Sequence, residues 1–113
     1  MTNSNVKPTL YLLNAPILTH YGLWRFDGPI TLIEAHNYLK NGFVSGIGHQ
    51  ATADYLTALL SIHCPFNRQP CVMQAGDLAI VLRLLCRLPE GKLLEQHELS
   101  QTPYHFGLLQ RLE

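Results

Sequence analysis

The sequence predicts a small α/β domain in which a mixed β-sheet is flanked by two main helices. Three observations predict this class. Apolar, β-rich segments lie near the start, the middle and the end of the chain, two segments with helical spacing lie between them, and no repeat or linker interrupts the order. A chain of 113 residues is of ordinary size for one domain. We therefore expect residues 1–113 to form a single domain, with residues 1–7 disordered.

Several segments have the composition of strands. The expected strands are residues 9–13, 22–29, 43–45, 78–87 and 104–112, with residues 67–73 as a further candidate and 22–29 readable as an extended loop. The longest of them is apolar on both faces apart from Arg83 and Arg87. A strand of that kind is central in its sheet and is covered by helices on at least one side.

Two segments predict helices. Thr31-Leu32-Ile33-Glu34 is a capping box, because Thr31 can accept from the N–H of Glu34 and Glu34 can reach back to the N–H of Thr31. This helix should end at Asn41-Gly42. A second helix is expected from about residue 49 to residue 62, with Pro65 ending it. Its buried stripe should contain Thr52, Leu56, Leu59 and Leu60.

Composition limits the partners. Eight basic and eight acidic residues give a formal charge of zero, which argues against a partner such as long DNA or RNA, because such binding needs a basic surplus. The charged fraction is 14%, against roughly 25% in an average soluble domain, and a homodimer would cover part of so weakly polar a surface. No apolar stretch is long enough for a membrane span and no signal-peptide pattern is present, so we expect a cytoplasmic protein with no membrane partner.

The strongest local signal is Ser45-Gly46-Ile47-Gly48-His49, which should join a strand to a helix. Gly46 and Gly48 let the backbone approach a ligand closely, and a helix start presents unpaired N–H groups that favour a phosphate. An imidazole at His49 could give a proton to a leaving oxygen there. The alternative is a turn that needs two glycines, with His49 as a polar cap.

Two arginines interrupt the longest strand. Arg83 and Arg87 would face the same side, about 13 Å apart at about 3.3 Å per residue. A phosphate suits a guanidinium through paired hydrogen bonds. An ion pair with Glu90, Asp54 or Glu34, or an edge strand with both heads in water, is the alternative. No His, Cys or Asp cluster has zinc spacing and carboxylates are scattered, so any phosphodiester chemistry here should need no metal or other cofactor.

These motifs together resemble the viral-type ring nucleases, small dimeric proteins that include anti-CRISPR proteins acting against type III systems, and relatives carried by bacteria. The resemblance spans nearly the whole chain. It is carried by Tyr11-Leu12-Leu13-Asn14, the segment from Gly42 to Ala53, Asn67-Arg68, the segment from Arg87 to Lys92, and the closing Gly107-Leu108-Leu109-Gln110-Arg111-Leu112. The combination of Gly48-His49-Gln50-Ala51-Thr52 with Arg87-Leu88-Pro89-Glu90-Gly91 is specific.

The resemblance implies a homodimer that binds cyclic tetra-adenylate and cleaves it without metal to linear di-adenylates ending in a 2′,3′-cyclic phosphate. It implies that His49 is the general acid and that Arg87 stabilises charge on the phosphate. It also implies that Glu90, near Arg87, has a supporting or orienting role. The expected substrate-binding residues are Asn14, Gly46, Gly48, Thr52, Asn67, Arg68 and Arg83. If the gene is viral, the protein would act in the cytoplasm of the host.

The chain departs from the family at Ala15-Pro16-Ile17, at Ala51 and at Arg83, where some members carry serine, serine and glutamine respectively. The alternatives to cleavage are a protein that binds or sequesters a cyclic oligoadenylate without cutting it, and a structural or interaction protein with no nucleotide ligand.

Overall fold

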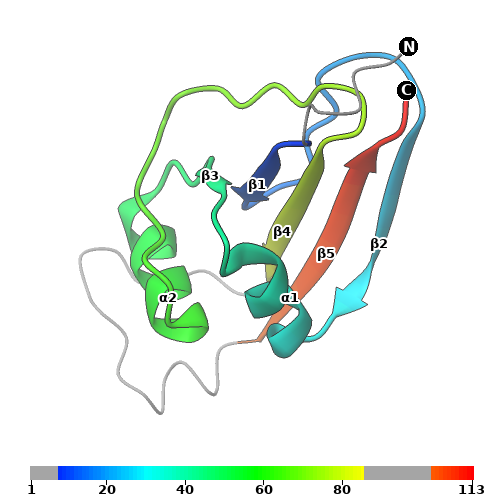
Figure 1. Ribbon diagram of the computed structural model, residues 1–113. Helices are drawn as coiled ribbons and strands as arrows, with labels where there is room; N and C mark the ends of the chain where they lie inside the picture. Colours follow the sequence, from blue (N-terminus) through cyan, green and yellow to red (C-terminus); the bar gives the residue numbers. More distant parts are fainter. Residues whose placement is uncertain (1–7, 86–102) are drawn as a thin grey trace.

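The computed structural model describes residues 8–85 and 103–113. There, a five-stranded mixed sheet has the order β2-β5-β4-β1-β3, and both helices pack on one of its faces (Figure 1). The elements are β1 (Leu10–Leu13), β2 (Trp24–Ile30), α1 (Leu32–Leu39), β3 (Val44–Ser45), α2 (Gln50–Leu60), β4 (Leu78–Leu84) and β5 (Tyr104–Arg111). The predicted fold class is confirmed.

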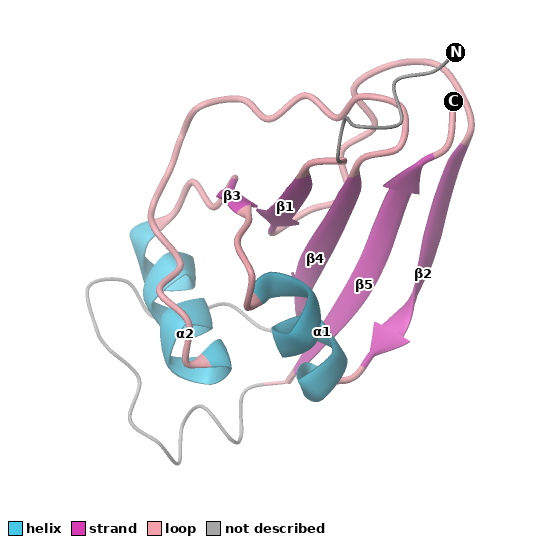
Figure 2. Ribbon diagram, in the orientation of Figure 1, coloured by secondary structure: helices cyan, strands magenta, loops and turns pink. Residues whose placement is uncertain are grey.

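The sheet is parallel on one side and antiparallel on the other (Figure 2). β1 pairs in parallel with β3 and with β4, while β5 runs antiparallel between β4 and β2. β4 is therefore central, as its apolar sequence predicts, and its residues 79–82 are buried. The carboxyl ends of β1, β3 and β4 all lie at the same edge of the sheet.

Alternation along the strands separates two apolar clusters. Leu12, Ile80, Leu82 and Phe106 face the helices and pack with Ala35 and Leu39 of α1 and with Ala53, Leu56 and Leu60 of α2. The opposite face carries a smaller cluster, which consists of Leu13, Met73, Ala79, Val81 and Leu109, with Tyr11, Trp24 and Cys71 beside it. The sheet thus has a main core under the helices and a thinner layer behind it.

Helix α1 begins as its sequence predicts. The backbone N–H of Glu34 donates to the Thr31 hydroxyl at 3.1 Å, and the Thr31 N–H donates to the Glu34 carboxylate at 2.9 Å. Both halves of the capping box are therefore present. His36 is half-buried, and its Nδ1 lies 3.2 Å from the carbonyl oxygen of Leu60.

Helix α2 is shorter than expected. It ends at Leu60 because Ser61 takes a left-handed conformation with φ 56° and ψ 33°, well before Pro65. The expected stripe is otherwise close to the observed one, with Thr52, Leu56 and Leu60 buried and Leu59 half-buried. The buried set also includes Ala53 and Tyr55.

The expectation of a strand over residues 67–73 is wrong. This segment is an irregular loop whose N–H at Asn67 donates to the carbonyl of Ile47, 2.8 Å away, instead of joining the sheet. Pro70 also has no N–H for a ladder. Of the long strand expected over residues 78–87, β4 covers Leu78–Leu84 and Leu85 is already outside it. Arg87 and Glu90 lie outside the described residues.

Candidate functional site

The glycine turn predicted from the sequence lies at the edge of the sheet where parallel strands end. Ser45 closes β3 beside Leu12 of β1, and five residues later α2 begins. Ligands of α/β proteins commonly bind outside the carboxyl ends of parallel strands. Residues 45–49 are called the glycine turn below.

Ser45 holds the glycine turn from inside. Its side chain is buried, and its hydroxyl donates to the carbonyl of Pro65 at 2.6 Å and accepts from the N–H of Ile47 at 3.2 Å. The N–H of Gly46 donates to the carbonyl of Leu12 at 2.8 Å and so extends the β1–β3 pairing by one bond. The turn is therefore fixed to the sheet on one side and to the loop after α2 on the other.

The two glycines have different surroundings. A Cβ at Gly46 would lie 2.6 Å from Cδ2 of Leu13 and 2.9 Å from Sγ of Cys71, so a larger residue there would force these side chains to move. A Cβ at Gly48 would meet Cγ of Arg68 at 3.6 Å, which is an ordinary contact. Packing therefore disfavours a side chain at Gly46, whereas the surroundings of Gly48 leave room for a Cβ.

Asn67 fastens the loop after α2 to the glycine turn. Its Nδ2 donates to the carbonyl of Ser45 at 2.6 Å, and its Oδ1 accepts from the N–H of Gln69 at 3.0 Å. With the backbone bond to Ile47, three hydrogen bonds position this residue. Asn67 thus orients the loop, and its direct contact with a ligand stays a prediction.

Arg68 brings a positive charge to the same turn. Its Nε donates to the carbonyl of Gly48 at 3.2 Å, and its Cζ lies 5.5 Å from the centroid of the Phe66 ring. The side chain is exposed. The bond through Nε leaves the two terminal nitrogens of the guanidinium for an anion.

His49 is the N-cap residue of α2, with φ −128° and ψ 127°. Its side chain forms no capping bond and is exposed, while its carbonyl accepts from the N–H of Ala53 at 3.0 Å. The imidazole is therefore presented to solvent beside the first-turn N–H groups of the helix. A phosphate bound to those groups would lie next to an available proton donor.

The electrostatics of the turn favour an anion. The positive end of the α2 dipole and the Arg68 guanidinium add to each other, and the first turn of α2 contains no acidic residue. Asp54, one turn further, accepts a 2.9 Å bond from Gln50. Burial raises the pKa of the Cys71 thiol beside Gly46, which disfavours a thiolate nucleophile there.

The other predicted site residues are distributed over the described chain. Asn14 is exposed directly after β1, at the same sheet edge as the glycine turn. Thr52, in the first turn of α2, is only 8% exposed, and its contact with a ligand stays a prediction. Arg83 is exposed on β4, opposite His105 of β5, and forms no ion pair with Asp54 or Glu34.

Two contacts carry no local sequence signal, one at the glycine turn and one between β4 and β5. The partner of Ser45 lies 20 residues further along the chain, at Pro65, and nothing near either residue predicts that contact. The juxtaposition of Arg83 and His105 depends on the β4–β5 register, which only the folded sheet specifies.

Residues 8–85 and 103–113 contain no group of three His, Cys, Asp or Glu side chains placed to hold a metal ion. No helix in these ranges is long and apolar enough to span a membrane.

One family model and several known proteins match most of this chain. A family model described as STIV B116-like matches residues 10–106. The protein YddF of Bacillus subtilis (strain 168) is 36% identical over 104 residues, which cover 89% of this chain and 95% of YddF. Protein 26 of Sulfolobus islandicus filamentous virus is 36% identical over 83 residues, which cover 72% of this chain and 70% of that protein.

A solved structure has the same fold. B116 of Sulfolobus turreted icosahedral virus superposes with a TM-score of 0.78, over 90% of this chain and 98% of B116, at 22% sequence identity. The similarity at this level concerns the fold. The glycine turn and the sheet edge around it lie within the residues that the family model matches.

Proposed function

The chain belongs to the STIV B116-like family, and on that premise we propose that it is a metal-independent ring nuclease that cleaves cyclic tetra-adenylate. The observation that carries the proposal is the glycine turn, where an exposed, uncapped His49 adjoins the N-terminus of α2 and the Arg68 guanidinium is bonded to the carbonyl of Gly48. This arrangement suits one phosphodiester group and needs no basic surface elsewhere, in accord with the zero formal charge.

The proposed reaction is an internal transfer. The ribose 2′-hydroxyl attacks its neighbouring phosphorus, a P–O2′ bond forms, and the P–O5′ bond breaks. The attacking 2′-hydroxyl gives its proton to water, and His49 gives its proton to the departing 5′-oxygen, so the products carry a 2′,3′-cyclic phosphate and a 5′-hydroxyl. Two such events on opposite sides of the ring yield two linear di-adenylates. Positioning the 2′-hydroxyl in line with the P–O5′ bond is the main demand on the protein.

Charge stabilisation would come from several sources. The first-turn N–H groups of α2 and the Arg68 guanidinium can donate hydrogen bonds to the phosphate oxygens, whose negative charge increases in the transition state. Arg87 and Glu90, which lie outside the described residues, keep the roles that the family resemblance implies, stabilisation of the phosphate and support of that arginine. Asn14, at the same sheet edge, is the expected contact on the β1 side.

We further propose that the protein acts as a homodimer in the cytoplasm. A two-fold axis would match the symmetry of a four-membered ring and would present two His49 residues to opposite phosphates. Exposed apolar side chains are available for such an interface. They include Ile17, Leu18, Tyr21 and Leu23 between β1 and β2. Sedimentation analysis of the purified chain tests this, and a monomer at working concentration would contradict it.

The first experiment is to incubate the purified protein with cyclic tetra-adenylate in excess EDTA and to identify products by mass spectrometry. Di-adenylate with a cyclic phosphate is the expected product. An intact ring that nevertheless raises the melting temperature would favour a protein that binds or sequesters the ring. An intact ring with no thermal shift would rule out this ligand, because a tight ligand at 100 times its Kd stabilises by about 2.7 kcal/mol.

A further inference from the structure

A small pocket lies on the other half of the sheet from the glycine turn, where it is lined by residues of β2, β4 and β5. It has a volume of about 210 Å³ and is lined by residues 26–29, Arg83 and residues 105–107. None of these residues belongs to the glycine turn. β5 is three strand positions from β3, or about 14 Å at roughly 4.8 Å per strand. This cavity is called the β2–β5 pocket below.

Two basic side chains face each other at the rim of the β2–β5 pocket. Arg83 of β4 and His105 of β5 are direct partners in the antiparallel register. Among the residues that the structure describes, neither side chain takes part in a hydrogen bond or an ion pair. Basic groups placed directly opposite each other do not stabilise a sheet. An anion bound between Arg83 and His105 would interact favourably with both side chains and would offset the unfavourable placement of two basic groups opposite each other.

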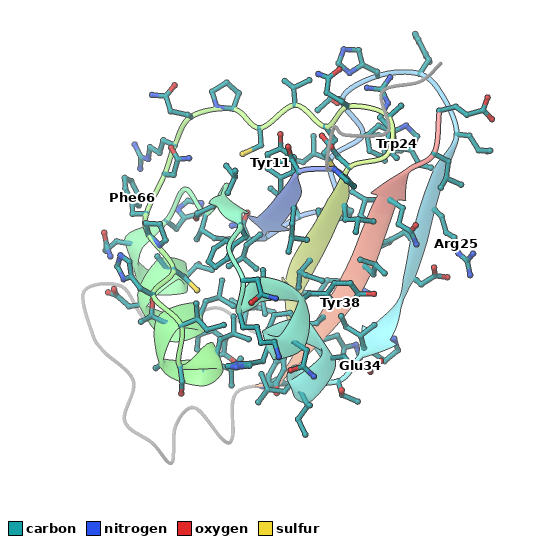
Figure 3. All side chains as sticks on the ribbon, in the orientation of Figure 1. Tyr11, Trp24, Arg25, Glu34, Tyr38 and Phe66 are labelled. Carbon is teal, nitrogen blue, oxygen red and sulfur yellow. The ribbon has the colours of Figure 1, made fainter. Side chains whose placement is uncertain are left out.

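Asp27, the acidic residue of the β2–β5 pocket, does not offset the basic side chains of the pocket. Asp27 accepts a 2.6 Å bond from Nε of Arg25, so its carboxylate is already paired. Figure 3 shows the labelled Arg25 side chain on the outer strand β2, at the edge of the sheet. The balance of the β2–β5 pocket is therefore basic.

An aromatic ring forms one wall of the pocket. A Cβ at Gly107 would lie 2.6 Å from Cε1 and 2.9 Å from Cζ of Phe26, so the ring rests directly on the backbone of β5. Phe26 is still 45% exposed, which leaves part of the ring free to contact a ligand. A half-exposed ring beside an anion site is suited to a nucleobase next to its phosphate.

We propose that the β2–β5 pocket is a subsite for one nucleotide unit, with a phosphate between Arg83 and His105 and a base against Phe26. On the proposed function, on which this choice of ligand rests, the unit is an adenylate of the ring. The cavity is smaller than the roughly 300–1,000 Å³ of pockets that enclose a drug-sized molecule, so it takes one unit and not a whole oligonucleotide. His105 and Phe26 thereby join the residues that select the substrate.

The test is a titration of the full-length, ¹⁵N-labelled protein with adenosine 5′-monophosphate, followed by NMR. We expect saturable shifts of the amide signals of residues 26–28 and 105–107, at concentrations up to about 10 mM, enough to detect a Kd of about 1 mM. Adenosine alone and inorganic phosphate alone should each bind more weakly than the monophosphate. Equal shifts with inorganic phosphate would overturn the contact between the base and Phe26.

Matched variants assign the contacts. Arg83→Gln and His105→Gln should each weaken binding about ten-fold, because each removes a charge-assisted hydrogen bond. Phe26→Leu should weaken it by a smaller factor. Lys40→Gln, His63→Gln and Tyr38→Leu change exposed residues of the same kinds outside the pocket and should leave the titration unchanged. Arg83 and His105 are exposed, so their variants should fold, which unshifted signals elsewhere in the spectrum verify.

The outcomes separate this inference from the proposed function. In one outcome, the wild type cleaves the ring, the monophosphate leaves residues 26–28 and 105–107 unshifted, and Arg83→Gln and His105→Gln have the wild-type KM. The subsite is then wrong and the ring-nuclease proposal stands. If those signals shift but the ring is neither bound nor cleaved, the pocket is a nucleotide site and the ring-nuclease proposal fails. Shifts confined to residues 46–52 would also overturn the subsite.

Discussion

The two helices of this protein begin in opposite ways. At α1, the Thr31 hydroxyl and the Glu34 carboxylate each accept a backbone hydrogen bond and so satisfy two N–H groups. At α2, the N-cap residue is His49, whose side chain makes no capping bond, and the first turn has no acidic residue. Both helices contribute to the same core cluster on one face of the sheet.

The difference indicates what each helix start contributes. A side-chain cap at the N-terminus stabilises a helix by about 1 kcal/mol, and α2 lacks this stabilisation. The backbone around His49 has the extended conformation that a serine or aspartate cap would use. α2 therefore begins without a side-chain cap, beside Arg68, while two N–H groups at the start of α1 are already bonded to its own side chains.

Removing the imidazole is the strongest way to sharpen this contrast. His49→Ala should lower the rate of ring cleavage by about 10²- to 10⁴-fold, the usual contribution of a positioned proton donor. The exposed side chain makes no capping bond, so the melting temperature should stay close to that of the wild type. Rates are measured by mass spectrometry under single-turnover conditions.

The control for His49→Ala is His63→Ala, which changes an exposed histidine just past the other end of α2. It should cleave at the wild-type rate. Equal activity of His49→Ala and His63→Ala would remove the basis for treating the two helix starts differently.

The two glycines of the turn form a second pair of probes. Gly46→Ala should destabilise the protein by about 1–3 kcal/mol, because its Cβ would overlap Leu13 and Cys71. Gly48→Ala should change the free energy of unfolding by less than Gly46→Ala, since its Cβ makes only ordinary contacts, yet it should weaken ring binding. Urea denaturation and a binding titration of each variant measure both effects. A Gly48→Ala variant that binds and cleaves like the wild type would show that no ligand approaches this backbone.

The sequence predicted those parts of the fold that depend on local signals. The capping box of α1 requires only Thr31 and Glu34, three residues apart, and it is present as expected. The apolar run of β4 likewise predicted a central strand. The end of α2 was misplaced because Ser61 adopts a left-handed conformation that favours glycine or asparagine, and serine gives no such signal.

The site was predictable only in part, for the same reason. The glycine turn and His49 are adjacent in sequence, and the structure confirms the strand-turn-helix junction that they predict. The expected strand over residues 67–73 failed because Asn67 is bonded to Ser45 and Ile47, about twenty residues away, and that contact overrides its β-like composition. The pairing of Arg83 with His105 likewise depends on strand register, which no pattern within either strand specifies.

Exchanging the capping chemistry of the two helices has a smaller expected effect. Thr31→Ala should destabilise the protein by about 1 kcal/mol, and His49→Ser should stabilise it by about the same amount by adding the missing cap. His49→Ser should also lose cleavage, which would separate stability from activity at one position. Thermal denaturation of the two variants and of their combination measures the changes. A His49→Ser protein that is less stable than the wild type would indicate that His49 itself supports the helix.

The smallest expected effect is a pH dependence confined to α1. The backbone hydrogen bond from Thr31, followed by the bond from its side chain, lowers the pKa of Glu34 below its ordinary value. A lowered pKa in the folded state stabilises the protein above the unfolded-state value, about 4.3, and the gain is lost as the pH falls through the folded-state value. The stability difference between the wild type and Glu34→Gln should therefore shrink between neutral and acidic pH, as measured by urea midpoints. Parallel pH profiles would mean that the Glu34 charge does not stabilise this helix start. At α2, where a carboxylate would repel a phosphate, the corresponding position is Thr52, which has no such charge.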